Sequence, residues 1–323
     1  MKQQRVSFLI CVIIFSFLSC TKSDENITVF NGNIVFLNQK QIDDFGELGY
    51  NHITGNVEIG STDSPTSDIN NLDNLKQLKT IDGSLYIGKN ETLANIDGLM
   101  NLTSIGKHLQ IRYNKILENI NGLDNLTSIS GDMFIEESVA LTQIDGLRNL
   151  SFIGGKISLY NNKLLNNIDG LANISSIRDD ATFYGNDALA NIDGLKKVVL
   201  IEGSIKIDTN KNLTNLNGLS NLISVSNDFT IAENNALTDI NGLSNLSIVG
   251  VAVQIWSNNA LTNLDALNNL SSVQFFSIKS NSGLSNFCGI NPLFTSTNPG
   301  THTVENNAYN PNYQNFVDGN CSQ

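Results

Sequence analysis

The stretch GSLYIGKNETLANIDGLMNLTSIG, residues 83–106, contains the repeat that decides the fold. Its tetrapeptide Ile96-Asp97-Gly98-Leu99 returns at a constant spacing of 24 residues, with Leu, Asn or Ala substituted at single positions of some copies. The later copies begin at Ile120, Ile144, Ile168, Ile192, Leu216, Ile240 and Leu264. A repeat of roughly 20 to 50 residues is typical of a solenoid, whose coils bury their apolar sides only by stacking on one another. The pattern predicts one elongated domain.

Each copy also contains a short alternation of apolar and polar residues, as in Leu109-Gln110-Ile111 and in 157–159 (ISL). Alternation with a period of two indicates a half-buried β-strand. Strands that recur once per coil stack into a parallel sheet along the solenoid axis, with neighbouring strands about 4.8 Å apart. We therefore expect a mainly β fold.

Two rows of short polar residues recur where the chain has to turn. The first contains Asn90, Asn114, Asn162, Asn186, Asn210, Asn234 and Asn258, with Ser138 in one coil, and the second contains Asp97, Asn121, Asp145, Asp169, Asp193, Asn217, Asn241 and Asp265. Such side chains can hydrogen-bond to the backbone of a turn, and a glycine after the second row tolerates a positive φ. Ala266 replaces that glycine in the last copy, so we expect a distorted turn there.

Both ends of a solenoid need covering, because an open end exposes the core and a strand edge. Near the N-terminus, Ile42, Phe45 and Leu48 recur at three-residue spacing and predict a short capping helix. Near the C-terminus, Cys288 and Cys321 form an even pair that favours a disulfide over two free thiols or a metal site. This bridge would hold the irregular tail over the last coil.

The first 20 residues have the order of a bacterial lipoprotein signal. Lys2 and Arg5 precede an apolar run, 6–18, that is too short to span a bilayer and suits a signal-peptide core. The run ends at Cys20, which we expect to be lipidated; the alternative is an ordinary secretory signal with a chance cysteine. Thr21 and the acidic stretch after it favour the outer membrane and display at the cell surface, with the periplasmic leaflet as the alternative.

These observations divide the chain into four parts. We expect a signal peptide over 1–19, a tether over 20–30, the solenoid over 31–286 and a C-terminal cap over 287–323.

The chain resembles the receptor L-domain family, the leucine-rich-repeat-like β-helices found in growth-factor receptors and in bacterial surface lipoproteins. The residues that carry the likeness are Phe45–Ile59, the repeat over 83–106, Phe287–Leu293 and Asn306–Pro311. The likeness covers roughly residues 31 to 321. It implies a right-handed β-solenoid of 24-residue coils and a function in binding a ligand or partner without catalysis. The cysteine-rich modules and kinase of the receptors have no counterpart here.

Residues at equivalent positions of successive coils share one face, so the outward strand positions indicate a candidate site. Phe134, Tyr160 and Tyr184 fall on consecutive coils, and Arg112 and Tyr113 flank them. Exposed aromatic side chains beside an arginine are the usual composition of a binding hot spot. The alternative is that aromatic residues favour strands and support the sheet by stacking.

The sequence gives little indication of catalysis. His108, Asp132, Lys156 and Asp180 occupy one position of successive coils, where a ladder of ion pairs is a simpler interpretation than a polysaccharide lyase site. We expect no cofactor and no metal, and the net charge of −12 argues against nucleic acid. The resulting hypothesis is a lipid-anchored surface module for adhesion or for recognition of a protein or carbohydrate. The alternatives are a periplasm-facing structural or assembly lipoprotein and, more remotely, a β-helix enzyme acting on polysaccharide.

Overall fold

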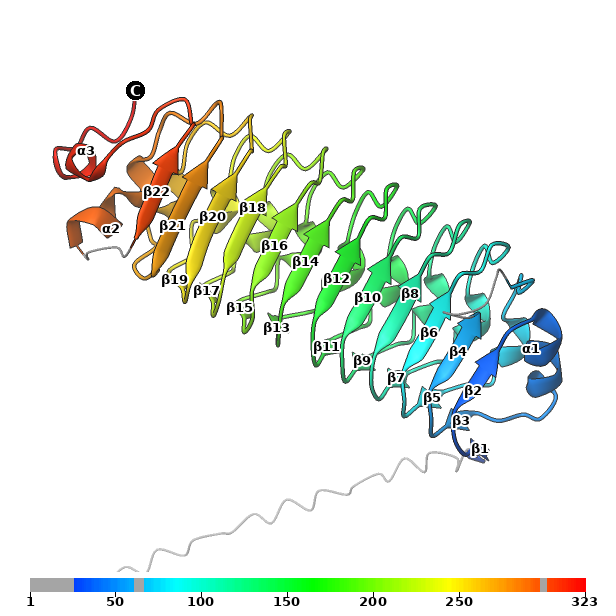
Figure 1. Ribbon diagram of the computed structural model, residues 1–323. Helices are drawn as coiled ribbons and strands as arrows, with labels where there is room; N and C mark the ends of the chain where they lie inside the picture. The colour runs from blue at the N-terminus through cyan, green and yellow to red at the C-terminus, as the bar shows by residue number, and fades with distance from the viewer. Residues whose placement is uncertain (1–25, 61–66, 297–300) are drawn as a thin grey trace, which may run out of the picture.

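The protein is an elongated, mainly β rod, as the computed structural model describes it for residues 26–60, 67–296 and 301–323 (Figure 1). The expected signal peptide and Cys20, the expected lipidation site, lie outside these residues. In the described ranges, no helix has both the length and the apolar character that crossing a membrane requires.

Twelve strands of the described residues form one large parallel sheet along the rod (Figure 1). They are β2 (Ile34–Phe36), β4 (Val57–Gly60), β6 (Leu85–Gly88), β8 (Leu109–Arg112), β10 (Met133–Glu136), β12 (Ile157–Tyr160), β14 (Ala181–Tyr184), β16 (Ile205–Asp208), β18 (Phe229–Ala232), β20 (Ala252–Trp256), β21 (Phe275–Lys279) and β22 (His302–Glu305). In the regular part of the sheet, partner residues are 24 positions apart, as in the pair Met133 and Ile157. The period of the sequence is therefore also the register of the sheet.

Shorter strands form a second side of the rod, along the lower edge of the view in Figure 1. Six of them pair in the order β1 (Val29–Phe30), β3 (His52–Ile53), β5 (Thr80–Ile81), β7 (Ser104–Ile105), β9 (Ser128–Ile129) and β11 (Phe152–Ile153). Four more continue the row as β13 (Ser176–Ile177), β15 (Leu200–Ile201), β17 (Ser224–Val225) and β19 (Ile248–Val249). Each of these strands has one residue outside and one in the core.

The repeated tetrapeptide forms short 3₁₀ turns on the remaining side of the rod. They are η1 (Asp73–Leu75), η2 (Asp97–Leu99), η3 (Asn121–Leu123), η4 (Asp145–Leu147), η5 (Asp169–Leu171), η6 (Asp193–Leu195), η7 (Asn217–Leu219), η8 (Asn241–Leu243), η9 (Asp265–Leu267) and η10 (Cys288–Ile290). The apolar residue before each turn and the one that ends it are buried, as Ile168 and Leu171 illustrate.

The glycine of this turn has a different role from the one predicted. The left-handed glycines are elsewhere in the described chain, and Gly98 has an ordinary negative φ. A Cβ at Gly98 would instead overlap the carbonyl group of Leu72 in the preceding coil. Glycine suits this position in most coils because successive turns pack closely. The expected distortion at Ala266 is also absent, since Leu264 enters η9 at φ −117°, close to −119° for Ile240.

The first polar row is a buried ladder of asparagines that links each coil to its neighbours. Asn186 is typical: its backbone N–H donates to Oδ1 of Asn210 at 3.1 Å, and its Nδ2 donates to the carbonyl of Leu159 at 2.9 Å. Its own Oδ1 accepts the backbone N–H of Asn162 at 3.1 Å. The side chain is fully buried. The prediction that this row bonds to the backbone of the turns is confirmed.

The N-terminal end carries the helix α1 (Gln39–Gly46), which packs on aromatic residues of the first strands. Ile42 and Phe45 are buried, and the Phe45 ring lies 5.3 Å from that of Phe36. Leu48, the third residue of the predicted apolar face, is 60% exposed because the helix ends before it. Val29 already pairs with the sheet, so the expected tether over 20–30 overlaps β1.

The C-terminal end consists of α2 (Asn291–Ser296), β22 and α3 (Tyr313–Val317). Cys288 and Cys321 are joined by a disulfide. The rings of Phe294 and Phe316 stack with their centroids 4.0 Å apart, which packs α2 against α3. Because β22 pairs with β21, part of the segment expected to be a cap extends the large sheet.

Candidate binding face of the large sheet

The candidate residues lie on four consecutive strands of the large sheet. Arg112 ends β8, Phe134 is the second residue of β10, and Tyr160 and Tyr184 end β12 and β14. Strand side chains alternate between the two faces, so residues flanking buried Ile135 or Leu159 point outward. The face that they share is turned toward the viewer in Figure 1.

Tyr160 and Tyr184 form a stacked pair. They are direct partners in the parallel register, and their ring centroids are 4.8 Å apart with an angle of 11° between the planes. This separation equals the typical distance between strands, about 4.8 Å, so the sheet itself sets the stack. Tyr160 is 37% exposed. Since each ring covers one face of the other, the pair offers ring edges and phenol hydroxyls to a ligand.

Arg112 and Phe134 form the second contact of this face. The guanidinium carbon lies 4.7 Å from the centre of the Phe134 ring, within the range of a cation–π interaction. Nε of Arg112 lies 3.3 Å from Oε2 of Glu136, and the other oxygen of that carboxylate accepts the hydroxyl of Ser158 at 2.8 Å. The guanidinium therefore contacts both the Phe134 ring and the Glu136 carboxylate, with Nε in an ion pair and without a hydrogen bond.

Two charged residues that the sequence analysis did not select complete the face. Nζ of Lys206 lies 5.5 Å from the centre of the Tyr184 ring and 2.9 Å from Oδ2 of Asp208. Both occupy the outward positions of β16, in register with the candidate residues. The signal was present in the sequence, because the register places β16 beside β14. We define the aromatic strip as Arg112, Phe134, Glu136, Ser158, Tyr160, Tyr184, Lys206 and Asp208.

Tyr113 lies apart from the strip. It follows β8 at φ 57°, in the left-handed region, and its side chain is exposed. Equivalent residues after other strands, such as Glu137 and Asn161, have the same conformation. In the described part of the chain, Tyr113 stacks on none of the other candidate side chains. The left-handed turn takes it away from the outward row that the strands present.

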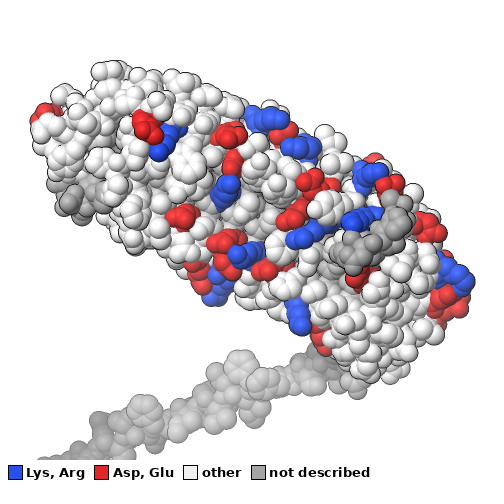
Figure 2. All heavy atoms as spheres, viewed as in Figure 1, with Lys and Arg blue, Asp and Glu red and all other residues white. Residues whose placement is uncertain are grey.

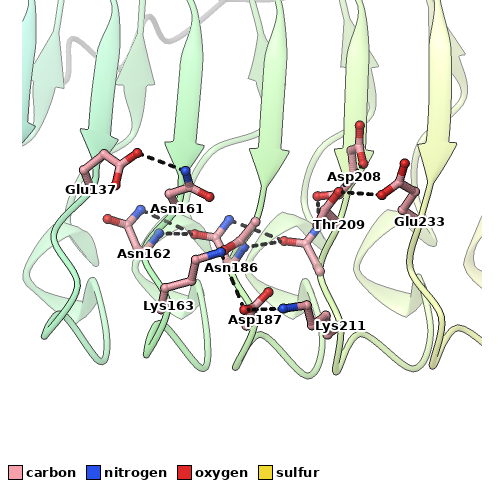
Figure 3. A network of polar contacts seen from close by, with 12 residues as sticks. Glu137, Asn161, Asn162, Lys163, Asn186, Asp187, Asp208, Thr209, Lys211 and Glu233 are labelled. Atoms are coloured by element: carbon pink, nitrogen blue, oxygen red, sulfur yellow. Dashed lines mark hydrogen bonds and ion pairs between the residues drawn. The ribbon is translucent and has the colours of Figure 1, made fainter.

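The corner beside the strip contains a polar network that links several coils (Figure 3). Nδ2 of Asn161 donates to Oε1 of Glu137 at 2.9 Å, and Lys211 reaches Oδ2 of Asp187 at 2.9 Å. Nζ of Lys163 donates to the carbonyl of Gly185 at 3.0 Å. These side chains mostly bond to one another and to the backbone, so the corner stabilises the stack of coils and frames the strip.

The row that contains His108, Asp132, Lys156 and Asp180 is also engaged in holding coils together. Oδ1 of Asp132 accepts the backbone N–H of Lys156 at 2.8 Å, and Oδ1 of Asp180 accepts that of Ser204 at 2.9 Å. Nζ of Lys156 donates to Oδ2 of Asp180 at 2.9 Å. The Ser204 N–H, and after it Lys156, hold the pKa of Asp180 below its ordinary value. This row is a ladder of hydrogen bonds and ion pairs.

The chemistry available at the aromatic strip is that of recognition. It offers ring edges and hydroxyls, and its charged groups occur as neighbouring opposite pairs. Figure 2 shows charges of both signs interspersed along this side of the rod and sparser toward its C-terminal end. Within the ranges that the structure describes, no three His, Cys, Asp or Glu side chains are grouped to hold a metal.

No model of a protein family matches the chain, and no curated protein matches it.

Proposed function

We propose that this protein is a non-catalytic binding module that presents the outward face of its large sheet to a protein or carbohydrate partner. The observation that carries the proposal is the aromatic strip. It concentrates Arg112, Tyr160 and Tyr184 in one outward row, with Phe134 in the neighbouring row, on four adjacent strands. Gly88 and Ala232 occupy the first of these rows on either side of the strip. Tyrosine and arginine, together with tryptophan, are the residues most enriched in binding hot spots.

The fixed geometry of the strip supports the same conclusion. Stacking holds Tyr160 and Tyr184, and Glu136 with Phe134 holds Arg112. A ligand that binds to such a surface loses little free energy to the ordering of side chains. The polar ladders beside the strip support a scaffold function over catalysis, because their carboxylates already accept backbone N–H groups or bind lysines.

The proposed scaffold is a right-handed solenoid of 24-residue coils of the receptor L-domain type. The 24-residue offset between strand partners supports the coil length. The packing of α1 through Ile42 and Phe45 and the bridge from Cys288 to Cys321 support capped ends.

We further propose that the module is a lipoprotein of the outer membrane, anchored through Cys20 and displayed at the cell surface. The support is the order of Lys2, Arg5, the apolar run and Cys20 in the sequence. Protease treatment of intact cells tests this placement. Loss of the protein while a periplasmic control survives is expected; protection until the outer membrane is opened would instead favour the periplasm-facing lipoprotein.

The choice of face is tested with a triple variant, Phe134→Ala, Tyr160→Ala and Tyr184→Ala. Cells that display the wild type or the variant are screened against a glycan array and a panel of host extracellular proteins. Any ligand of the wild type is expected to lose at least about tenfold in affinity with the variant. Trp256→Ala is the matched control, since Trp256 is an aromatic residue in the same outward row, three coils beyond Tyr184. Equal loss with the control would show that binding is not specific to the aromatic strip, and unchanged binding of the triple variant would show that the choice of face is wrong.

A further inference from the structure

The side of the rod formed by the short strands carries an alternation that the 24-residue repeat does not require. The first residue of successive short strands, with Ser272 bridged to β19, forms a row that we call the side row. Its members are Ser104, Ser128, Phe152, Ser176, Leu200, Ser224, Ile248 and Ser272. From Ser128 onward, small hydroxyl and large apolar residues alternate. Phe152 and Ile248 are exposed, and Leu200 is partly exposed.

The residues immediately before the side row form a second row, which we call the hydroxyl row. Two apolar residues interrupt it, next to Leu200 and Ser224 of the side row. The members of the hydroxyl row are Thr103, Thr127, Ser151, Ser175, Val199, Ile223, Ser247 and Ser271. Hydroxyls of this row donate to the carbonyl one coil earlier, as Ser247 donates to Ile223 at 3.2 Å. Val199 and Ile223 cannot make this bond, and Ile223 is 48% exposed. Two adjacent coils therefore lack the hydroxyl-to-carbonyl hydrogen bond of this row and expose apolar side chains instead.

A shallow depression lies at this interruption. It has a volume of about 430 Å³ and is lined by Val199, Asn221, Ile223 and Asn245. The amides of Asn221 and Asn245 each donate to a carbonyl of the preceding coil at 2.7 Å, which leaves the aliphatic side chains as the part open to a partner.

We propose that this side of the rod binds a second copy of the same chain, with the two rods antiparallel and a twofold axis crossing them between β15 and β17. In this arrangement each large residue of the side row meets a serine of the other copy. Leu200 faces Ser224, Ile248 faces Ser176, and Phe152 faces Ser272. A single axis places all three large residues opposite small ones, so the side row is complementary to itself.

The hydroxyl row follows the same symmetry. Val199 of one copy faces Ile223 of the other, and the reverse contact is identical, as a twofold interface requires. Beyond them, Ser175 faces Ser247, and hydroxyls meet hydroxyls. The two positions that interrupt the ladder therefore bury their apolar side chains against each other, next to the depression.

Two other arrangements fit less well. Parallel rods in register would place Phe152 on Phe152 and Ile248 on Ile248, with large side chains colliding and serines facing gaps. Parallel rods shifted by one coil would match large with small, but such a contact does not close and would continue into a filament. The antiparallel pair satisfies the alternation and closes.

The charges of this side are compatible with the antiparallel pair. Lys197 faces Asn221, and Glu202 faces Ser226, so neither charged side chain meets a like charge. Residues from Phe152 to Ser272 span five coil spacings, about 24 Å. This is a small contact, and we expect a dissociation constant in roughly the micromolar range. The central pairs contribute most, because twist of the rods separates the outer ones.

The first test compares two variants of the full chain that each add one cysteine, Ile223→Cys and Ser104→Cys, in the membranes of cells that produce the protein. A short bis-maleimide crosslinker is added, and dimers are counted on a denaturing gel with the wild type as background. The two thiols of Ile223→Cys would be one coil apart along the axis, about 5 Å, and those of Ser104→Cys nine coils apart, about 43 Å. Crosslinking of Ile223→Cys alone is expected. Crosslinking of both variants would contradict the antiparallel pair, and crosslinking of neither would overturn the interface.

The second test gives the two apolar positions the residue type of other coils, in the double variant Val199→Thr, Ile223→Thr. Sedimentation velocity of the detergent-solubilised full chain should show a dimer affinity at least about tenfold lower than that of the wild type. The melting temperature should not fall, because threonine can rejoin the hydroxyl ladder. An unchanged affinity would refute the interface. The triple variant of the aromatic strip should dimerise normally, so this proposal can fail or hold independently of the proposed function.

Discussion

Asn186 and Tyr184 are two residues apart on one coil, yet they belong to different regions: a buried row that is nearly invariant between coils and an outward row that varies. Asn186 is fully buried and bonds to the coils on both sides of it. Tyr184 points outward, and its contacts with Tyr160 and Lys206 are made by side chains that other coils lack. The buried position is asparagine in almost every coil, whereas the outward position varies from glycine to tryptophan.

The difference separates what holds the rod together from what is free to acquire a function. The side chain of a ladder residue accepts from and donates to the backbone of the preceding coil, so one change leaves two backbone groups of that coil unpaired. An outward residue interacts only with the side chains beside it. Repetition in this chain therefore marks structure, and departures from repetition on an exposed face mark candidate binding surfaces.

The largest effect is expected from Asn186→Ala. The change leaves the backbone N–H of Asn162 and the carbonyl of Leu159 without their side-chain partner in the interior. A buried group left unpaired costs about 1–3 kcal/mol, so we expect the free energy of unfolding to fall by roughly 3–5 kcal/mol. Urea unfolding followed by circular dichroism measures it.

The matched control is Asn186→Ser, because Ser138 already occupies this row: its backbone N–H donates to Oδ1 of Asn162 at 3.1 Å, and its hydroxyl donates to the carbonyl of Glu136 at 3.4 Å. We expect its loss to be well below that of Asn186→Ala. If both variants unfold like the wild type, the ladder is not what joins the coils.

Gly194→Ala should give the next largest effect, through contact between coils. A Cβ at this position would overlap the carbonyl oxygen of Ile168, and forcing extra volume into a packed site costs about 1–3 kcal/mol. We expect a loss near 2 kcal/mol in the same urea experiment. Ala266 is the natural counterpart, and Ala266→Gly serves as the control that should change stability little. Wild-type stability of Gly194→Ala would mean that the coils separate easily.

Tyr184→Ala should affect stability less than either Asn186→Ala or Gly194→Ala. It removes the stack on Tyr160 and the contact with Lys206, and an aromatic pair contributes about 0.5–1.5 kcal/mol. We expect a loss near 1 kcal/mol, while Tyr184→Phe retains the stack and should stay close to the wild type. A loss as large as that of Asn186→Ala would assign the outward row a structural function and weaken the binding proposal.

Much of the fold follows from the sequence because one coil specifies the next. The alternation at 109–111 and 157–159 marked strands that the structure contains, and the asparagine row bonds as predicted. The predicted role of the turn glycines was wrong. Their negative φ and their contact with a carbonyl of the preceding coil appear only once the coils are stacked, so the sequence of one coil does not indicate them. Leu48 was placed on the capping helix because spacing alone does not indicate that the helix ends at Gly46.

The aromatic strip was only partly predictable. Register alone placed Phe134, Tyr160 and Tyr184 on adjacent strands. Tyr113 could not be excluded, since its left-handed conformation depends on where the strand ends. Lys206 was missed because the candidates were chosen for aromatic or arginine side chains, although the 24-residue register already places its strand beside that of Tyr184.

The smallest effect concerns the exposed ladder, and its sign depends on pH. Asp180 has a folded-state pKa below its ordinary value, mainly through the Ser204 N–H and then through Lys156. Its stabilisation is therefore complete above the unfolded-state pKa, about 3.9, and is lost as the pH falls through the folded-state value. Asp180→Asn can still accept the Ser204 N–H but cannot bind a proton there.

We expect Asp180→Asn to lose less stability than the wild type between about pH 5 and pH 2, and to be slightly less stable at pH 7 because the pair with Lys156 is weakened. Both differences should stay below about 1 kcal/mol, since exposed ion pairs contribute little. Melting temperatures measured across this pH range provide the test. A difference that reverses sign with pH would show that this outer ladder, unlike the buried asparagines, joins the coils through charge; parallel curves would show that the backbone bond alone does so.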